Sequence, residues 1–309
     1  MIWYIIRRIV QVIPVFFGAT FLIYFMVFAL PGDPVLALGG DRGLNPAVAD
    51  AIRSEYNLDK PFIVQYFLYI GGILTGDLGT TFSGQPVANI LAQTFPVTLK
   101  LALIAIVIEA VIGVGVGLVS GLRKNGVFDT VSLLISLVLI SLPIFVLAFV
   151  AQYFIAIRLG WARTTVSSTA PFNELLLPAV VLALFVVANV IRLTRTSVIE
   201  NLDADFVRTA TAKGLPRRRV IGVHILRNSL IPVVTLIGTD FGLLIVGATV
   251  TEGIFNVPGV GNTLFKAIII SEAPTVVSFV TVFVIVYLVT NLLVDILYAF
   301  LDPRIRYGK

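Results

Sequence analysis

The sequence predicts an all-α integral membrane protein with six transmembrane helices and both termini in the cytoplasm. Three observations carry this prediction. Of the 309 residues, 58% are hydrophobic and only 13% are charged, about half the charged share of an ordinary soluble domain. Six apolar stretches come close to or exceed the span of about 20 helical residues that a bilayer requires. The basic residues are concentrated in alternate connecting segments.

Composition also excludes several classes of function. An intrinsically disordered chain is excluded because apolar residues dominate. Because the chain has no cysteine, it has no disulfide framework and no cysteine-based metal, redox or nucleophilic site. His224 is the single histidine, so a site with several histidine ligands is excluded. We expect His224 itself to be a loop or interface residue.

The predicted spans are 9–30, 101–119, 130–157, 175–191, 229–251 and 276–301. We expect the first span to stay in the mature chain, because it is longer than a signal-peptide core and no small-residue cleavage site follows it. Three acidic residues, Glu109, Asp240 and Asp295, fall inside spans. A charge there is costly if it faces lipid, so these side chains should face protein or a watery path.

Charge placement gives the orientation. Fifteen of the 22 basic residues fall in one alternate set of segments, and the other seven are spread over longer segments. Lys and Arg mark the cytoplasmic side, so both termini are predicted to be cytoplasmic. The net charge of +5 is therefore explained by topology and contact with anionic lipid. Nucleic acid is not expected as a partner.

Residues 31–100 are predicted to form a structured cap on the outer face, between a first helix at 1–30 and a five-helix transmembrane core at 101–301. The cap opens at Leu30-Pro31-Gly32-Asp33-Pro34, which should break the first helix. We expect a helix over 45–56 with Asn45 as N-cap, an aromatic interfacial helix over 61–75, turns at 77–79 and 84–86, and a short helix over 86–94. Residues 302–309 form a cytoplasmic tail.

The loop 250–275 is the second outward segment. Pro258, Gly259 and Gly261 suit a tight turn, and an apolar stretch follows at 263–270. Two interpretations stay open. The segment dips back toward the membrane and lines a pathway, or it is a plain outer loop.

The inward loop 192–228 is the most informative stretch. Asp203 is suited to cap a helix over 203–213, and Asp205 suits its positive first turn. Gly214 fits the left-handed position after that helix, and Pro216 fits the first position of a second, basic helix. Low apolar content makes 203–213 a poor membrane anchor, so we interpret it as a helix that docks to a partner rather than one that lies on the membrane.

One face of this helix should carry Phe206, Ala210 and Lys213, which are spaced at i, i+4 and i+7. Ala210 and Ala212 are small, so a partner surface could approach closely there. Glycines at a spacing of four, Gly113, Gly117 and Gly121, predict close helix packing, as do Gly238 and Gly242.

The loop resembles the EAA loop of permease subunits of binding-protein-dependent ABC importers. The similarity covers Asp205 to Gly214 and then Leu215 to Pro232, although Thr209-Ala210 with Ala212 replaces the Glu-Ala-Ala triplet. Most of the chain is similar to the first permease of dipeptide and oligopeptide importers. The matching pieces are Tyr4 to Arg8 with Pro14, Leu30 to Pro34, Gly76 to Gly79, Gly84 to Pro86, Thr251 to Phe255, Pro258 to Gly261 and Asp302 to Arg306.

The resemblance implies a type I ABC importer permease fold, in the plasma membrane of a bacterium or archaeon. It implies pairing with a second permease, two cytoplasmic ATPase subunits that bind ATP and Mg²⁺, and an extracytoplasmic binding protein that delivers peptide. The chain has no Gly-x4-Gly-Lys-Ser/Thr motif, so we expect no ATP site in it. The coupling residues implied are Asp203, Asp205, Phe206, Arg208, Thr209, Ala210, Ala212, Lys213 and Gly214, followed by Leu215, Pro216, Arg217, Arg218 and Arg219.

Asp240, Glu109 and Glu252 are candidates for the pathway, and Phe255, Pro258, Gly259 and Gly261 for an outer gate. A structural pairing with arginine is expected for Asp295. We expect a transport subunit rather than an enzyme, with di- or oligopeptides as cargo. A nickel chelate, glutathione or another small solute stays open as cargo, and a stand-alone secondary transporter stays open as a class. An intramembrane enzyme is disfavoured because no paired-Asp motif, histidine cluster or activated serine is present.

Overall fold

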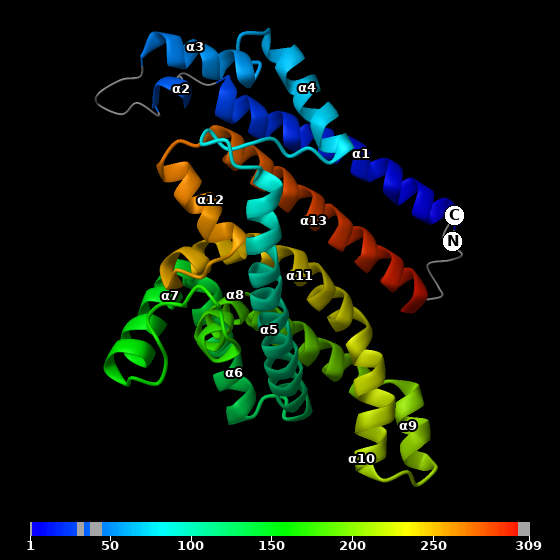
Figure 1. Cartoon of the computed structure of the whole chain (residues 1–309). Coiled ribbons are helices and arrows are strands. Elements are labelled where there is room, and N and C mark those ends of the chain that lie inside the picture. The colour runs from blue at the N-terminus through cyan, green and yellow to red at the C-terminus, as the bar shows by residue number, and fades with distance from the viewer. Residues whose placement is uncertain (1, 30–33, 38–44, 302–309) are drawn as a thin grey trace. The chain divides into compact units, whose positions relative to one another are not determined.

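The computed structural model describes residues 2–29, 34–37 and 45–301. Within these ranges the regular elements are helices, with one isolated bridge between Thr80 and Pro86. In order they are α1 (Ile2–Phe28), α2 (Pro34–Ala37), α3 (Pro46–Glu55), α4 (Phe62–Thr75), α5 (Val87–Leu122), α6 (Val127–Ser141), α7 (Ile144–Ala151), the π-helical η2 (Gln152–Arg158), α8 (Phe172–Leu202), α9 (Asp205–Ala212), α10 (Arg217–Arg219), the π-helical η3 (Val220–Leu226), α11 (Arg227–Phe255), α12 (Val260–Ile269) and α13 (Ala273–Leu301) (Figure 1).

Five helices of the described chain are long and apolar enough to cross a membrane, and the number becomes six if α6 and the bent continuation from Ile144 to Arg158 form one span. The two parts of that span meet at an angle of 106°. The span predicted over 130–157 is therefore divided into two helical parts. Pro143 is the cause, because its ring removes a backbone donor and holds the preceding Leu142 in an extended conformation.

Three predicted helix boundaries are also wrong. The short helix expected over 86–94 and the second span form the single helix α5, with Pro96 inside it. The helix of the fourth span continues past 191 as α8 and ends at Leu202. Residues 192–202 contain no glycine or proline, so no helix breaker ends it earlier. The predicted loop 192–228 therefore begins as helix. The second helix predicted in this loop is confirmed, and it continues into the fifth span from Arg217 to Phe255.

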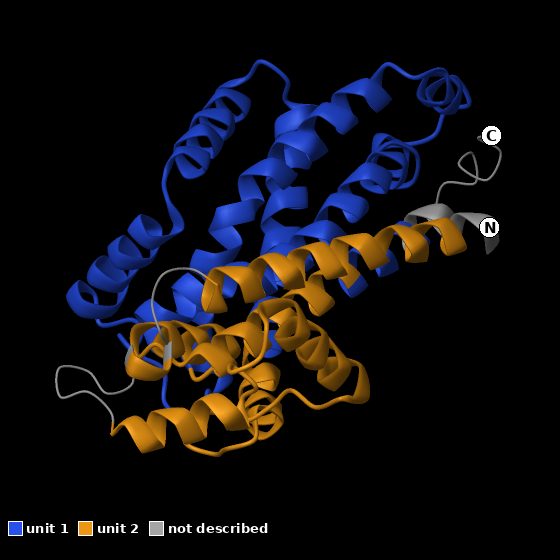
Figure 2. Cartoon of the chain, turned by 90° about the horizontal axis from the view of Figure 1, so that it is seen from above, with its two compact units in different colours: residues 1, 99–257, 289–309 blue, residues 2–98, 258–288 orange. Residues whose placement is uncertain are grey.

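Two compact units make up the described chain (Figure 2). Unit 1 contains residues 99–257 and the chain from 289 onward. Unit 2 contains residues 2–98 and 258–288.

Helix α8 forms the centre of unit 1, packed against α11, α6 and α7. Its contact with α5 depends on three glycines. A Cβ atom on Gly113 would lie 2.5 Å from Val190 Cγ1, one on Gly117 would lie 2.6 Å from Thr194 Cβ, and one on Gly121 would lie 2.7 Å from Val198 Cγ1. Helices α5 and α8 thus run in the same direction, and each advance of four residues along α5 corresponds to an advance of four residues along α8. The predicted packing role of these glycines is confirmed.

A second close approach in unit 1 involves α11 and the last part of α13. A Cβ atom on Gly238 would lie 2.8 Å from Val294 Cγ2. The predicted packing role is therefore confirmed for Gly238. Its neighbour in the pattern, Gly242, is buried.

Aromatic side chains join the helices of unit 2. The Tyr66 hydroxyl of α4 lies 3.0 Å from Thr20 Oγ1 of α1 and donates to the Phe17 carbonyl at 3.0 Å. One turn further along α4, the Tyr69 hydroxyl donates to Thr281 Oγ1 of α13 at 2.6 Å. Helix α4 thus packs Tyr66, which is buried, and Tyr69, which is half-buried, against α1 and α13, while Phe67 stays 63% exposed.

Local signals in unit 2 were predicted well. Asn45 caps α3, with its Oδ1 accepting from the Ala47 amide at 3.0 Å. Gly79 and Gly84 adopt left-handed φ values of 76° and 81° in the predicted turns. The predicted break over Leu30 to Pro34 falls largely outside the described residues, as does the tail after 301.

Candidate functional site

The candidate docking helix is α9, a two-turn helix that follows α8 (Figure 1). It begins at Asp205, with Ala204 as its N-cap. The predicted N-cap role of Asp203 is wrong, because α8 extends to Leu202 and Asp203 serves as the C-cap of that helix. Asp205 lies in the first turn as predicted, where its charge suits the positive helix end.

The end of α9 is formed as predicted around Gly214. This residue has φ of +77°, and its amide donates to the Thr211 carbonyl at 2.9 Å. The Leu215 amide donates to the Ala210 carbonyl at 3.3 Å, which closes the end of the helix in the manner of a Schellman motif. Pro216 then caps the next helix rather than occupying its first position, a shift of one residue from the prediction.

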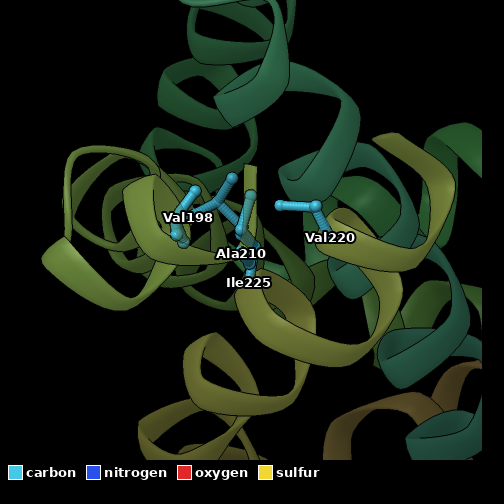
Figure 3. Close-up of a cluster of buried hydrophobic side chains, with 5 residues drawn as sticks. Val198, Ala210, Val220 and Ile225 are labelled. Atoms are coloured by element: carbon cyan, nitrogen blue, oxygen red, sulfur yellow. The ribbon is translucent and has the colours of Figure 1, made fainter. Parts of the chain in front are cut away.

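The inner face of α9 carries Val207 and Ala210, which are 7% and 4% exposed. These two side chains form a cluster with Val198 of α8 and with Val220 and Ile225 of η3 (Figure 3). We call this group the α9 cluster. Ala210 is therefore covered by its own chain, and the prediction that a partner approaches closely at Ala210 is wrong.

The outer face of α9 carries the side chains that could meet a partner. Phe206 is 39% exposed, and Thr209, Ala212 and Lys213 are exposed as well. The predicted shared face of Phe206, Ala210 and Lys213 is divided, because the short helix turns Ala210 onto the α9 cluster. Arg208, Arg217, Arg218 and Arg219 are also exposed, so the surface around α9 is basic with one aromatic side chain.

The α9 cluster links the helix to three parts of unit 1. Leu118 and Leu122, at the end of α5, pack against the cluster, as do Leu202, Leu215 and Ile221. A force on α9 would therefore reach α8 directly and the continuous helix from Arg217 to Phe255 through η3. His224 lies in η3, within this long helix rather than in a loop.

The three candidate pathway carboxylates lie in the interior of unit 1. Glu109 and Glu252 are 0% exposed, and Asp240 is 7% exposed. Glu109 of α5 lies close enough to Asp240 of α11 for the two carboxyl groups to interact. Both Glu109 oxygens and Asp240 Oδ2 are buried without a hydrogen-bond partner among the described residues.

The candidate gate residues follow α11. Phe255 is fully buried, and its carbonyl accepts from the Val166 amide at 2.9 Å. The left-handed conformation that ends α11 belongs to Asn256, with φ of 48°. Gly259 is extended and caps α12, and Gly261 lies buried within that helix. The predicted tight turn through the glycines is therefore wrong, because Asn256 supplies the change of direction before them.

Sequence reasoning missed two polar networks in unit 1. The Asp129 carboxylate binds Arg195 of α8 and also accepts from Ser120 Oγ at 2.5 Å. Glu174 accepts from the Ser167 amide at 2.7 Å and pairs with Arg163 Nη1 at 2.8 Å. An arginine and an aspartate at the ends of two different apolar stretches are a signal for such pairing, since each alone would be costly.

Five long apolar helices, or six with the bent pair, define a polytopic membrane protein. A family profile described as binding-protein-dependent transport system inner membrane component matches residues 113–307. A second profile, described as the N-terminal part of such a membrane component, matches residues 1–102. The chain belongs to the family of membrane permease components of binding-protein-dependent transport systems, as the resemblance of its loop implied.

Curated relatives align along nearly the whole chain. The dipeptide transport system permease protein DppB of Escherichia coli (strain K12) is 36% identical, with 100% of both chains covered. The protein of the same description from Alkalihalophilus pseudofirmus is 35% identical over 99% of this chain and 100% of its own. A putative peptide transport system permease protein of Brucella abortus (strain 2308) is 36% identical over 98% of each chain.

Proposed function

We propose that the chain is one of two permease subunits of an ATP-driven importer of di- or oligopeptides in a bacterial inner membrane. The family membership supports the permease role, and the names of the full-length relatives support the peptide cargo. In this proposal a binding protein delivers the peptide from outside. Two ATPase subunits act from the cytoplasm, where both termini of the chain and α9 lie.

Helix α9 is proposed as the coupling helix that enters a cleft of an ATPase subunit. The observation that carries this proposal is the division of α9 into an anchored face and an exposed face. Val207 and Ala210 fix the helix to unit 1, while Phe206 and Lys213 stay exposed. An exposed aromatic side chain within a basic surface is typical of an interface anchor.

Motion would pass from α9 to the spans through the α9 cluster. Packed interiors transmit displacement because they are dense and resist compression. Val198 connects α9 to α8, and Val220 and Ile225 connect it to the helix that continues into α11. Closure of the ATPases would thus move two spans of unit 1 together and change which side of the membrane the pathway opens to.

Asp240, Glu109 and Glu252 are proposed to contribute to the pathway when the second permease and the peptide are present. Asp240 is the first choice, because it lies within α11, the helix that follows the coupling helix. Replacement by asparagine removes the charge and keeps the shape. If Asp240→Asn leaves peptide uptake and substrate range unchanged in the assembled complex, Asp240 has no pathway role.

The experiment that tests the coupling role uses the complete transporter. The chain is co-expressed with its second permease and its ATPase subunits, and the complex is purified by a tag on this chain. Phe206→Ala should lower the amount of co-purified ATPase subunit, with unchanged thermal stability of the permease. Val223→Ala is the matched control, because Val223 is an exposed apolar residue of the adjoining η3, at 49% exposure.

Two outcomes would contradict the proposal. The first is a wild-type chain that binds no ATPase subunit and transports peptide alone under an ion gradient. The second is an equal loss of ATPase subunit in Phe206→Ala and Val223→Ala, because Phe206 of α9 would then contribute no more to the contact than a residue outside α9.

A further inference from the structure

A cavity of about 400 Å³ lies within unit 2. Its size falls in the range of small-molecule sites, about 300–1,000 Å³. The lining comes from α1, the end of α3 with the residues that follow it, α4, the turn at 77–80 and the start of α13. We call it the Tyr24 pocket, after the side chain in its floor.

The floor of the Tyr24 pocket is aromatic and apolar. Tyr24 and Val277 are 4% and 1% exposed, and Phe28, Leu68 and Tyr69 add further apolar surface. The Tyr24 hydroxyl forms no hydrogen bond with another group in the described part of the chain. A buried tyrosine hydroxyl usually has a partner, so this one is available to a molecule in the pocket.

The mouth of the pocket is acidic. Glu55 and Asp77 line it and are exposed, and no lysine, arginine or histidine is among those lining residues that the structure describes. The ammonium group of Lys60 donates to Oδ1 of the lining residue Asn57 at 2.5 Å. Burial raises the pKa of Tyr56 and raises the pKa of Tyr69 to about 12. These two lining phenols are therefore neutral near pH 7.

Hydrogen-bond donors of the pocket are largely engaged, whereas acceptors remain. The Tyr56 hydroxyl donates to the Thr81 carbonyl at 2.6 Å, the Tyr69 hydroxyl to Thr281 Oγ1 at 2.6 Å, and the Ser278 hydroxyl to the Leu78 carbonyl at 2.8 Å. Asp77 uses Oδ1 to accept from the Gly79 amide at 2.8 Å, which leaves its second oxygen. The Glu55 carboxylate faces the solvent at the mouth.

We propose that the Tyr24 pocket binds a primary ammonium group attached to an apolar group, with the ammonium between Glu55 and Asp77 and the apolar part on the aromatic floor. An ammonium offers three donors and a positive charge to the free acceptors. Tyrosine faces attract cations as well. If the proposed peptide cargo is correct, the amino-terminal residue of a peptide has this chemistry.

The test measures binding of 4-fluorophenethylamine by fluorine NMR to the full chain in nanodiscs of uncharged phosphatidylcholine, with empty nanodiscs as the blank. Its neutral counterpart is 4-fluorophenethyl alcohol. We expect the amine to bind about tenfold more tightly than the alcohol. The double variant Glu55→Gln with Asp77→Asn should remove that preference, and Asp59→Asn should keep it, because Asp59 is an exposed cap carboxylate outside the pocket.

A second variant tests the floor independently of charge. Leu68→Trp places a larger side chain at a lining position that is 46% exposed, so it should reduce binding of both compounds with little effect on folding. Equal binding of amine and alcohol to the wild-type chain, or unchanged amine binding in both variants, would overturn the inference. Peptide uptake is measured separately, in the complete transporter. If the amine binds but no peptide is transported, the proposed cargo is refuted and the inference about the Tyr24 pocket is not.

Discussion

The guanidinium group of Arg195 holds the carboxylate of Asp129 through two hydrogen bonds, from Nε to Oδ1 at 2.5 Å and from Nη2 to Oδ2 at 2.7 Å. The Asn125 amide also donates to Oδ2, at 2.8 Å. Asp129 is 2% exposed. With Ser120 of α5 on the same carboxylate, this single group joins α5, α6, α8 and the turn between α5 and α6.

Arg195→Ala should destabilise the chain, because it leaves a buried carboxylate without its cation. Breaking a buried pair by removing one partner costs about 3–5 kcal/mol. We expect the lower end, about 3 kcal/mol, because the Arg195 side chain keeps 19% of its surface exposed. Thermal unfolding in detergent measures the effect.

Arg192→Ala is the matched control for this prediction. Arg192 lies one turn earlier on α8 and is exposed, so its loss should leave the melting temperature nearly unchanged. The double variant Arg195→Ala with Asp129→Asn should recover part of the stability. If Arg195→Ala melts like Arg192→Ala, the ion pair contributes nothing and the argument from burial is wrong.

The sequence predicts those features of this fold that depend on neighbouring residues. Apolar length predicted the five helices that are long and apolar enough to cross a membrane, and the left-handed glycine at 214 and the cap at Asn45 follow from short patterns that act within one turn. Features that depend on distant residues escaped prediction. The position of Asp129 at the end of an apolar stretch indicates that a cation pairs with it, but not that the cation is Arg195, because that contact follows only from how α6 packs on α8.

Helix α9 shows the same limit. Its existence and its end at Gly214 could be predicted from adjacent residues, but which side faces outward could not. A two-turn helix has too few residues for periodicity to separate its faces. Ala210 turned inward because Val198, Val220 and Ile225 supply an apolar surface there, and two of these three lie beyond the following turn.

Gly117→Leu should disrupt the contact between α5 and α8. A Cβ atom at this position would lie 2.6 Å from Thr194 Cβ and 2.7 Å from the Ile191 carbonyl oxygen, so the helices would have to separate. Overpacking of a packed core costs about 1–3 kcal/mol, and the bulk of leucine places this variant at the upper end. The melting temperature and the yield of folded protein report the loss.

Gly115 provides a control on the same helix. A Cβ atom at Gly115 meets no atom within 4 Å. Gly115→Leu should therefore keep or raise the stability, since glycine is a poor helix former. A comparable loss in both variants would show that the glycines matter for helix flexibility rather than for close packing.

Gly214→Ala should weaken the end of α9. The φ of +77° at this position strains any residue with a Cβ, at a cost of about 1–2 kcal/mol. Gly214→Asn should cost less, because asparagine tolerates the left-handed region. Hydrogen exchange of the α9 amides measures the effect, with Gly222→Ala as the control, because Gly222 has no left-handed φ and open space around its Cβ position. Equal protection in Gly214→Ala and Gly222→Ala would contradict the capping role.

Glu109→Gln should leave the stability unchanged or raise it, in contrast to the change at Asp129. Both carboxylates are buried, at 0% and 2% exposure, but Asp129 has a cation and Glu109 has another acid, Asp240, beside it. An amide of the same shape removes the cost of placing two acidic groups together in a low-dielectric interior. We therefore expect the two conservative changes to shift the melting temperature in opposite directions. Asp129→Asn should lower the melting temperature, and Glu109→Gln should not.

A large loss of stability in Glu109→Gln would contradict this prediction. It would mean that the glutamate binds a cation or a partner group in the native membrane. The measurement would then be repeated on the complete complex.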